Sequence, residues 1–181
     1  MSRPSRRCHA VLVGLALAVF AGGCSGAGGA DGTLELGDAD GAASMALERL
    51  DGEGTIRLAD YAGQPLVVNF FAETCAPCVD EMPAFEQVKQ AAAGEVAFLG
   101  VSTQESVEAG RSLVERTGVT WDLVRDPQGA FIRTVEGVGL PTTLLLGPDG
   151  DIVARRTGGL DEGELSDLLA DELGIIVESS P

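Results

Sequence analysis

The chain has 181 residues, of which 45% are hydrophobic, and its formal charge is −16 at pH 7. This length supports one ordinary hydrophobic core, so we expect a single folded domain. The negative charge should repel nucleic acid and anionic lipid headgroups, and at the least it keeps the protein soluble. The single histidine is His9, near the N-terminus. If that segment is removed, the protein lacks the histidine base of the common hydrolases and the imidazole of most transition-metal sites.

The first 23 residues have the features of a secretory signal. Three arginines precede an apolar run over residues 10–21, and two glycines follow it. A run of about a dozen residues is too short to cross roughly 30 Å of hydrocarbon, so we expect no permanent transmembrane helix. Residues 1–23 are therefore predicted to be a signal peptide, with a buried core helix as the alternative.

Residues 21–24, Ala-Gly-Gly-Cys, resemble a lipobox, the bacterial signal in which the cysteine is lipidated and becomes the first mature residue. The resemblance implies a lipoprotein anchored to the membrane through Cys24. Plain cleavage is the alternative, because Ala21 stands where a large aliphatic residue is usual. Residues 24–43 are dominated by Gly, Ala and Asp, a composition typical of a flexible tether. We therefore expect a tether over residues 24–43 and a folded domain over residues 44–177, on the extracytoplasmic face of the cell membrane.

The predicted domain starts with a hairpin over residues 46–57, because the turn sequence Asp-Gly-Glu-Gly lies between apolar positions. A short helical turn over 58–61 follows. The nearly uninterrupted apolar run at 65–71 predicts a central strand that is buried on both faces. Apolar residues at spacings of three and four then predict a helix over 75–93.

The second half of the domain continues the alternation of apolar strands and amphipathic helices. This alternation predicts an α/β fold with a central mixed β-sheet flanked by helices and an N-terminal β-hairpin extension. The turn sequence Gly-Pro-Asp-Gly predicts a final hairpin. The remaining elements are strands over 96–101, 121–125, 142–146 and 152–155, and helices over 105–117, 128–135 and 161–173.

Cys75 and Cys78 form a C-x-x-C motif directly after the buried strand. Cys75 is thereby placed at a helix N-terminus, where unpaired backbone N–H groups and the helix dipole favour a thiolate. Cys78 lies one turn later on the same face, from which it can attack a mixed disulfide on Cys75. The motif predicts thiol-disulfide exchange without a metal or cofactor. The alternatives are a zinc half-site, for which further ligands are missing, and a structural disulfide, which would close a very short loop.

Several short motifs together resemble those of the TlpA/ResA-type thiol-disulfide oxidoreductases, over about residues 46–172. The resemblance implies a thioredoxin-like fold. The matching sequences are Leu-Ala-Asp-Tyr-Ala-Gly at 58–63, Val-Val-Asn-Phe-Phe-Ala at 67–72, Cys-Ala-Pro-Cys at 75–78, Glu-Met-Pro at 81–83, Gly-Leu-Pro-Thr-Thr at 139–143 and Pro-Asp-Gly at 148–150.

The resemblance also implies roles for single residues. Pro141 matches the family's cis-proline, whose loop would lie against Cys75 and let the Leu140 backbone pair with an extended substrate. A trans turn proline is the alternative. Glu81 matches an acid near the buried cysteine that moves a proton during exchange, and a solvated surface acid is the alternative.

One position departs from the family pattern. The family usually has Trp immediately before the first cysteine, where this chain has Thr74. We assign Thr74 to substrate binding, with helix capping as the alternative. The neighbouring Glu73 is expected to oppose the thiolate and to raise the pKa of Cys75.

The expected function is reduction of disulfides in exported proteins, with cytochrome c maturation favoured by the resemblance. A membrane thiol donor is expected as an electron source, because disulfides persist outside the cell unless reducing equivalents are supplied. A disulfide-forming oxidase is an alternative, since the motif does not set the direction. Further alternatives are a peroxiredoxin-like peroxidase, a copper-delivery protein and a non-catalytic lipoprotein. The first usually has a threonine three residues before its reactive cysteine, and the second has C-x-x-x-C with a distant histidine.

Overall fold

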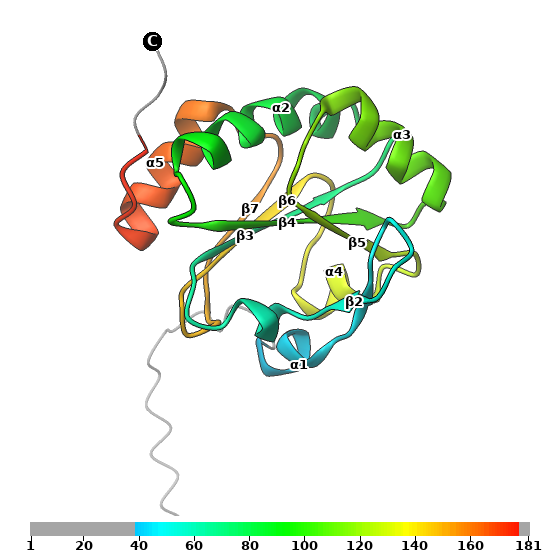
Figure 1. Ribbon diagram of the computed structural model, residues 1–181, viewed down its shortest axis with the longest axis horizontal. Helices are drawn as coiled ribbons and strands as arrows, with labels where there is room; N and C mark the ends of the chain where they lie inside the picture. Colours follow the sequence, from blue (N-terminus) through cyan, green and yellow to red (C-terminus); the bar gives the residue numbers. More distant parts are fainter. Residues whose placement is uncertain (1–38, 178–181) are drawn as a thin grey trace, which may run out of the picture. The chain divides into compact units, whose positions relative to one another are not determined.

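The computed structural model describes residues 39–177 (Figure 1). The predicted signal peptide, Cys24 and most of the predicted tether lie outside the described residues. Within residues 39–177, no helix combines the length and the apolar character that a membrane span requires.

A five-stranded mixed sheet in the order β5-β4-β3-β6-β7 forms the centre of the fold. Strand β3 (Leu66–Phe71) pairs in parallel with β4 (Ala97–Thr103) and antiparallel with β6 (Thr142–Leu146). The outer strands are β5 (Asp122–Asp126), parallel to β4, and β7 (Ile152–Thr157), antiparallel to β6. All six residues of β3 are buried, which confirms the prediction of a strand covered on both faces.

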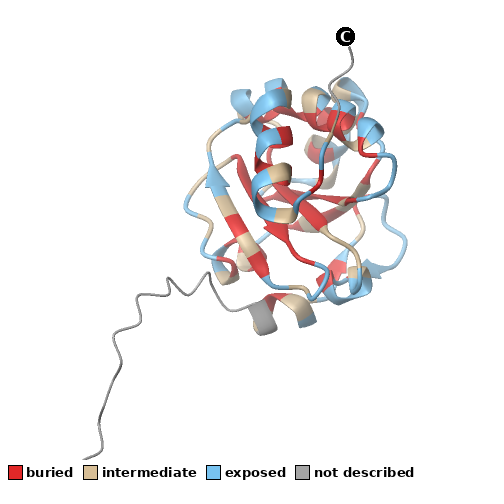
Figure 2. Cartoon of the chain, turned by 90° about the vertical axis from the view of Figure 1, so that its left-hand side faces the viewer, coloured by how far each residue is buried: buried red, intermediate tan, exposed pale blue. Residues whose placement is uncertain are grey.

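Three helices cover one face of the sheet: α2 (Ala76–Ala91), α3 (Val107–Thr117) and α5 (Glu162–Leu173) (Figure 1). Figure 2 shows their buried sides turned toward the strands and their exposed sides outward. The side chains buried between these helices and the sheet form the first core cluster. In this cluster the ring of Trp121 stacks on Phe98 with centroids 5.6 Å apart. Trp121 is buried and is therefore a core residue.

The other face is covered by shorter elements: α1 (Ala39–Ser44), the 3-10 helix η1 (Leu58–Tyr61) and α4 (Ala130–Thr134). They bury the side chains of the second core cluster, in which Phe70 of β3 packs against Phe131 of α4 with ring centroids 5.2 Å apart. The central strand thus contributes alternate side chains to both clusters.

The predicted N-terminal hairpin is confirmed. Strands β1 (Leu47–Glu48) and β2 (Thr55–Ile56) pair antiparallel, and the backbone N–H of Leu50 donates to the Leu123 carbonyl at 2.9 Å. A single β-bridge joins Arg49 to Val124 of β5. The hairpin therefore lies along the outer edge of β5 and covers an edge that would otherwise be open to pairing with other chains.

Helix α1 corrects the predicted domain boundary, because the sequence assigned residues 39–43 to the tether. Ala42 has no exposed surface and packs in the second core cluster. The six residues of this helix have a tether-like composition, without the apolar periodicity that indicates a helix. Burial of Ala42, rather than local sequence preference, explains why this segment is part of the fold.

Candidate functional site

Cys75 and Cys78 form a disulfide with an S–S distance of 2.04 Å, at the point where the chain leaves β3 and enters α2. Cys75 is the N-cap residue of α2, and its Sγ accepts a hydrogen bond from the Cys78 backbone N–H at 3.3 Å. Pro77 lies in the first turn, where the missing N–H of proline breaks no helical hydrogen bond. Cys75 is half-buried whereas Cys78 has no exposed surface, so Cys75 is the sulfur that faces solvent.

Glu81 lies in α2, one turn after Cys78, and only 3% of its surface is exposed. Its Oε1 accepts a hydrogen bond from Asn69 Nδ2 at 2.8 Å, and its Oε2 accepts one from the Leu160 backbone N–H at 3.1 Å. Burial raises the pKa of Glu81 to about 7, although both hydrogen bonds oppose the shift. The alternative of a solvated surface acid is therefore wrong.

Asn69 is a residue of this site that the sequence did not predict. Its side chain points from the centre of β3 toward α2, beside Thr143 of the neighbouring strand, whose Oγ1 accepts from Asn69 Nδ2 at 3.3 Å. The sequence contained one signal, a polar residue in an otherwise apolar central strand.

The Leu140–Pro141 peptide bond is cis, so the alternative of a trans proline is wrong. Pro141 is buried, and its carbonyl accepts a hydrogen bond from the Gly158 backbone N–H at 2.9 Å. Leu140 is half-buried and packs against both core clusters, the first of which also contacts Cys75.

Residues 158–160, between β7 and α5, connect the proline loop with Glu81. The segment is held to Pro141 through the Gly158 N–H and to Glu81 through the Leu160 N–H. Between these two bonds, a Cβ added to Gly159 would lie 3.5 Å from Pro77 Cβ and 3.8 Å from Glu81 Oε2. The backbone of this segment therefore lies against the first turn of α2 and keeps Glu81 from solvent.

Thr74 is exposed beside Cys75. Because Cys75 itself is the N-cap of α2, the alternative that Thr74 caps the helix is wrong. The neighbouring Glu73 has two contacts that hold it: its Oε1 lies 3.5 Å from Arg116 Nη1, and its backbone N–H donates to Glu105 Oε2 at 2.6 Å. The ion pair to Arg116 is partly exposed, so it offsets the Glu73 charge only modestly.

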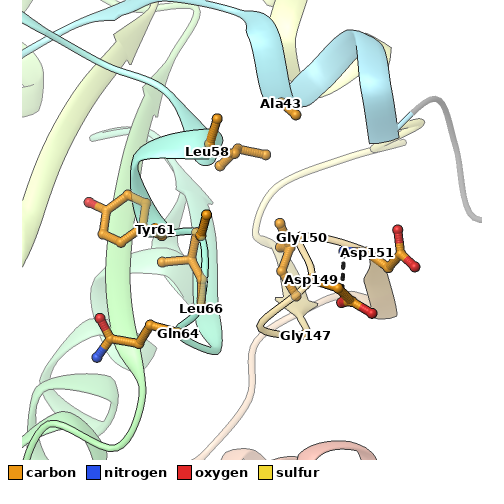
Figure 3. A pocket seen from close by; sticks show the side chains of 12 residues that line it. Ala43, Leu58, Tyr61, Gln64, Leu66, Gly147, Asp149, Gly150 and Asp151 are labelled. Atoms are coloured by element: carbon orange, nitrogen blue, oxygen red, sulfur yellow. Dashed lines mark hydrogen bonds between the residues drawn. The ribbon is translucent and has the colours of Figure 1, made fainter.

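A cavity of about 170 Å³ lies elsewhere in the described part of the chain, between α1, η1 and the turn that joins β6 to β7 (Figure 3). Its wall includes Leu58, Tyr61 and Leu146, and the nearby turn is held by the Asp151 N–H, which donates to Asp149 Oδ1 at 3.3 Å. None of the predicted site residues lines this cavity.

A disulfide at the N-terminus of a helix, with one sulfur toward solvent and the other buried against a mixed sheet, defines a thioredoxin-like thiol-disulfide oxidoreductase. The sequence profile of the AhpC/TSA family matches residues 39–155. The chain belongs to this family.

Two curated relatives identify the type of enzyme. Thiol-disulfide oxidoreductase ResA of Halalkalibacterium halodurans is 33% identical over 127 residues, which cover 67% of this chain and 69% of that protein. Thiol-disulfide oxidoreductase ResA of Bacillus subtilis is 30% identical over 153 residues, which cover 84% of this chain and 79% of that protein. These relatives confirm the resemblance to the ResA type and the activity class predicted from the Cys75–Cys78 motif.

Solved structures confirm the thioredoxin-like fold. A secreted Mycobacterium tuberculosis disulfide oxidoreductase homologous to E. coli DsbE superposes with a TM-score of 0.66 at 24% identity, covering 73% of this chain and 98% of that chain. A thiol:disulfide interchange protein of the thioredoxin family from Chlorobium tepidum TLS gives a TM-score of 0.64 at 24% identity, covering 74% and 95%.

Proposed function

We propose that this protein reduces disulfides in exported proteins on the extracytoplasmic face of the cell membrane, where a lipid on Cys24 anchors it. The resemblance to the ResA type favours apocytochrome c as a substrate. The observation that carries the proposal is the unequal exposure of the two sulfurs: Cys75 meets solvent, and Cys78 is buried behind it. This is the arrangement that two-step exchange requires.

The reaction starts from the dithiol form of the protein. The Cys75 thiolate attacks a substrate disulfide, forms a mixed disulfide with one substrate sulfur and expels the other, which takes up a proton. Cys78 then loses its proton and attacks Cys75 Sγ, which releases the second substrate sulfur and forms the Cys75–Cys78 disulfide. Two electrons pass from the protein dithiol to the substrate, which leaves with two thiols.

Glu81 is the proposed proton carrier of this sequence. It lies one helical turn after Cys78, and its pKa of about 7 allows it to exist in both protonation states at neutral pH. The carboxylate accepts the Cys78 proton when Cys78 attacks, and the acid later returns that proton to a leaving thiolate. Groups with a pKa near the working pH are the most effective in such transfers.

Substrate docking is assigned to the surface around Cys75. The Leu140 backbone, held beside the buried cis-proline Pro141, is proposed to pair with an extended segment of the substrate. Thr74 is proposed to contact the substrate in place of the larger aromatic side chain usual in the family. Its exposure beside Cys75 supports that assignment.

A reductase of this kind must be reduced again after each turnover. A membrane dithiol donor is the proposed source: its two thiols become a disulfide while Cys75 and Cys78 return to the dithiol. The donor is required because disulfides persist outside the cell without a supply of reducing equivalents.

The reduction potential of the Cys75–Cys78 couple tests the direction of transfer. Equilibration of the protein with glutathione or dithiothreitol should give a value well below about −200 mV, nearer to thioredoxin than to DsbA. A value near about −120 mV would make the protein an oxidant and would overturn the reductase proposal. The Cys75→Ser variant, which cannot form the disulfide, is the control.

The anchor is tested by a single substitution at the predicted lipidation site. The wild-type chain should incorporate a labelled fatty acid and sediment with membranes, whereas Cys24→Ser should lose the label. The Cys8→Ser variant is the matched control, because Cys8 lies inside the predicted signal peptide. Label retained by the Cys24→Ser variant would rule out this anchor.

A further inference from the structure

The carboxylate of Glu81 is surrounded by neutral hydrogen-bond donors. Its two partners are the Asn69 amide and the Leu160 backbone N–H, and burial with these two bonds accounts for the shift of its pKa. On α2, the helix that carries Glu81, Cys78 is part of the disulfide and Asp80 is exposed to solvent. From the segment after β7, Asp161 directs its carboxylate to the N–H of Glu164, at 2.8 Å.

The sheet and α5, which pack against α2, present no charged side chain to Glu81, and no charged group contributes to the shift of its pKa. The sheet presents Asn69 and Thr143 on the side that faces Glu81, both neutral. The buried residues that α5 contributes to the first core cluster are Leu165, Leu168 and Leu169, which are all apolar. The Asn69 amide is therefore the only side chain among the described residues that donates a hydrogen bond to Glu81.

Asn69 is itself anomalous for a residue in the centre of a sheet. Only 1% of its surface is exposed, and its Oδ1 is buried without a hydrogen-bond partner. A buried acceptor without a partner is unfavourable, and an apolar residue of similar size would avoid it. The stability of strand β3 therefore does not explain an asparagine at this position. Its hydrogen bond to Glu81 is the contact that an apolar residue would lack.

The geometry points to Asn69 as a positioning residue that sets the proton affinity of Glu81 and can hydrogen-bond both of its protonation states. In the arrangement seen here, Nδ2 donates to the carboxylate at 2.8 Å. Rotation of the amide by half a turn brings Oδ1 to the same place, where it accepts the O–H of the protonated acid. After this rotation Oδ1, which is buried without a partner in the arrangement seen here, gains one from the protonated Glu81.

This inference rests on the proposed role of Glu81 in exchange, and its test uses a signal that is independent of exchange. The Leu160 backbone N–H donates to Glu81 Oε2, so its NMR chemical shift should follow the ionisation of Glu81. The titration is recorded on isotope-labelled full-length protein in the disulfide form, in which Cys78 does not titrate. The Glu81→Gln variant should abolish the transition and so identifies its source.

The Asn69→Leu variant removes the donor at nearly constant volume. We expect the Leu160 transition to move upward from about 7 by about one pH unit, because a hydrogen bond to the charged form is lost. At pH 7 the rate of the proton-dependent exchange step should fall about fivefold and should recover at higher pH. The Thr143→Val variant is the matched control, because Thr143 contacts Asn69 but has no hydrogen bond to Glu81. The Leu160 transition measured in this variant should stay near 7.

An unchanged transition in Asn69→Leu, or an equal shift in Thr143→Val, would overturn the inference. If Asn69→Leu does not fold, Asn69→Asp replaces it, because a second carboxyl next to Oε1 should raise the transition above about 8. A transition that remains near 7 in Asn69→Asp would equally overturn it. If exchange by Glu81→Gln has the wild-type pH profile while the Leu160 transition still depends on Asn69, the proposed proton transfer fails and the positioning role stands.

Discussion

At the scale of single residues, Glu81 makes the stability of the protein depend on pH. Its pKa in the folded protein is about 7, above the ordinary 4.5, because burial disfavours the charged form. Between these two pH values the folded state holds a proton that the unfolded state has lost. Stability therefore falls as the pH rises from 4.5 to 7, by up to about 3 kcal/mol.

The Glu81→Gln variant should remove this penalty. We expect its free energy of unfolding at pH 8 to exceed that of the wild type by about 1–2 kcal/mol, less than the full penalty because the Gln amide loses part of the hydrogen bonding. At pH 4.5 the advantage should disappear. Urea denaturation at both pH values measures it, with Asp80→Asn as the control, since Asp80 is the exposed neighbour on the same helix. Equal destabilisation of Glu81→Gln at both pH values would contradict the linkage.

The residues of the site differ in how far the sequence could predict them. Cys75 and Cys78 are separated by one helical turn, so a local motif was sufficient to pair them. Asn69 and Glu81 are 12 residues apart on different elements, and Leu160 reaches Glu81 across 79 residues. The burial of Glu81, and therefore its raised pKa, depends on segments far away in the sequence, such as residues 158–160, and no local pattern contains that packing.

At the scale of elements, helix α2 carries a second buried acid whose environment is the opposite of that of Glu81. Burial would raise the pKa of Glu86, but hydrogen bonds from Gln90 and Thr120, together with the charge of Lys89, lower it below 4.5. Glu86 accepts from the Thr120 backbone N–H at 2.8 Å and from its hydroxyl at 2.7 Å. The carboxylate thereby joins α2 to the segment that leads into β5.

The Glu86→Gln variant should destabilise the fold by about 1–2 kcal/mol at pH 7, because a buried carboxylate with several donors is replaced by a neutral amide. Since the pKa of Glu86 is lowered by folding, its contribution is present above pH 4.5 and is lost as the pH falls through the lowered value. Urea denaturation at pH 7 and at a series of lower pH values should therefore show the full difference at pH 7 and a smaller one as the pH falls below 4.5. Glu95→Gln, at an exposed position after the same helix, should have no effect at any of these pH values.

The elements also show why some boundaries were predictable and others were not. Strand β3 was predictable because burial on both faces produces a continuous apolar run. Helix α3 was predicted to begin at 105, but it begins at Val107, after the N-cap Ser106. Glu105 instead uses its carboxylate to accept from the Ser102 hydroxyl, three residues before it, and from the Glu73 N–H, a contact of tertiary structure that no local pattern contains.

At the scale of the whole molecule, the dominant feature is a net charge of −16 on 181 residues. The described ion pairs, such as Arg49 with Asp122 at 2.8 Å, are few and partly exposed, so each contributes little. Repulsion among unpaired carboxylates should therefore outweigh these attractions and destabilise the compact state at low ionic strength. This destabilisation depends on the range of the electrostatic interactions, which salt shortens.

The midpoint of thermal unfolding at pH 7 should accordingly rise with salt, by a few °C between about 10 and 500 mM NaCl, as the screening length falls from roughly 30 Å to below 8 Å. The same titration near pH 4.2, the isoelectric point of the sequence, is the control. There the net charge is close to zero, and the midpoint should hardly respond. Salt weakens the attraction within ion pairs and the repulsion among like charges alike, so the larger of the two decides whether the midpoint rises or falls. A midpoint that falls with salt at pH 7 would therefore mean that the ion pairs outweigh the repulsion.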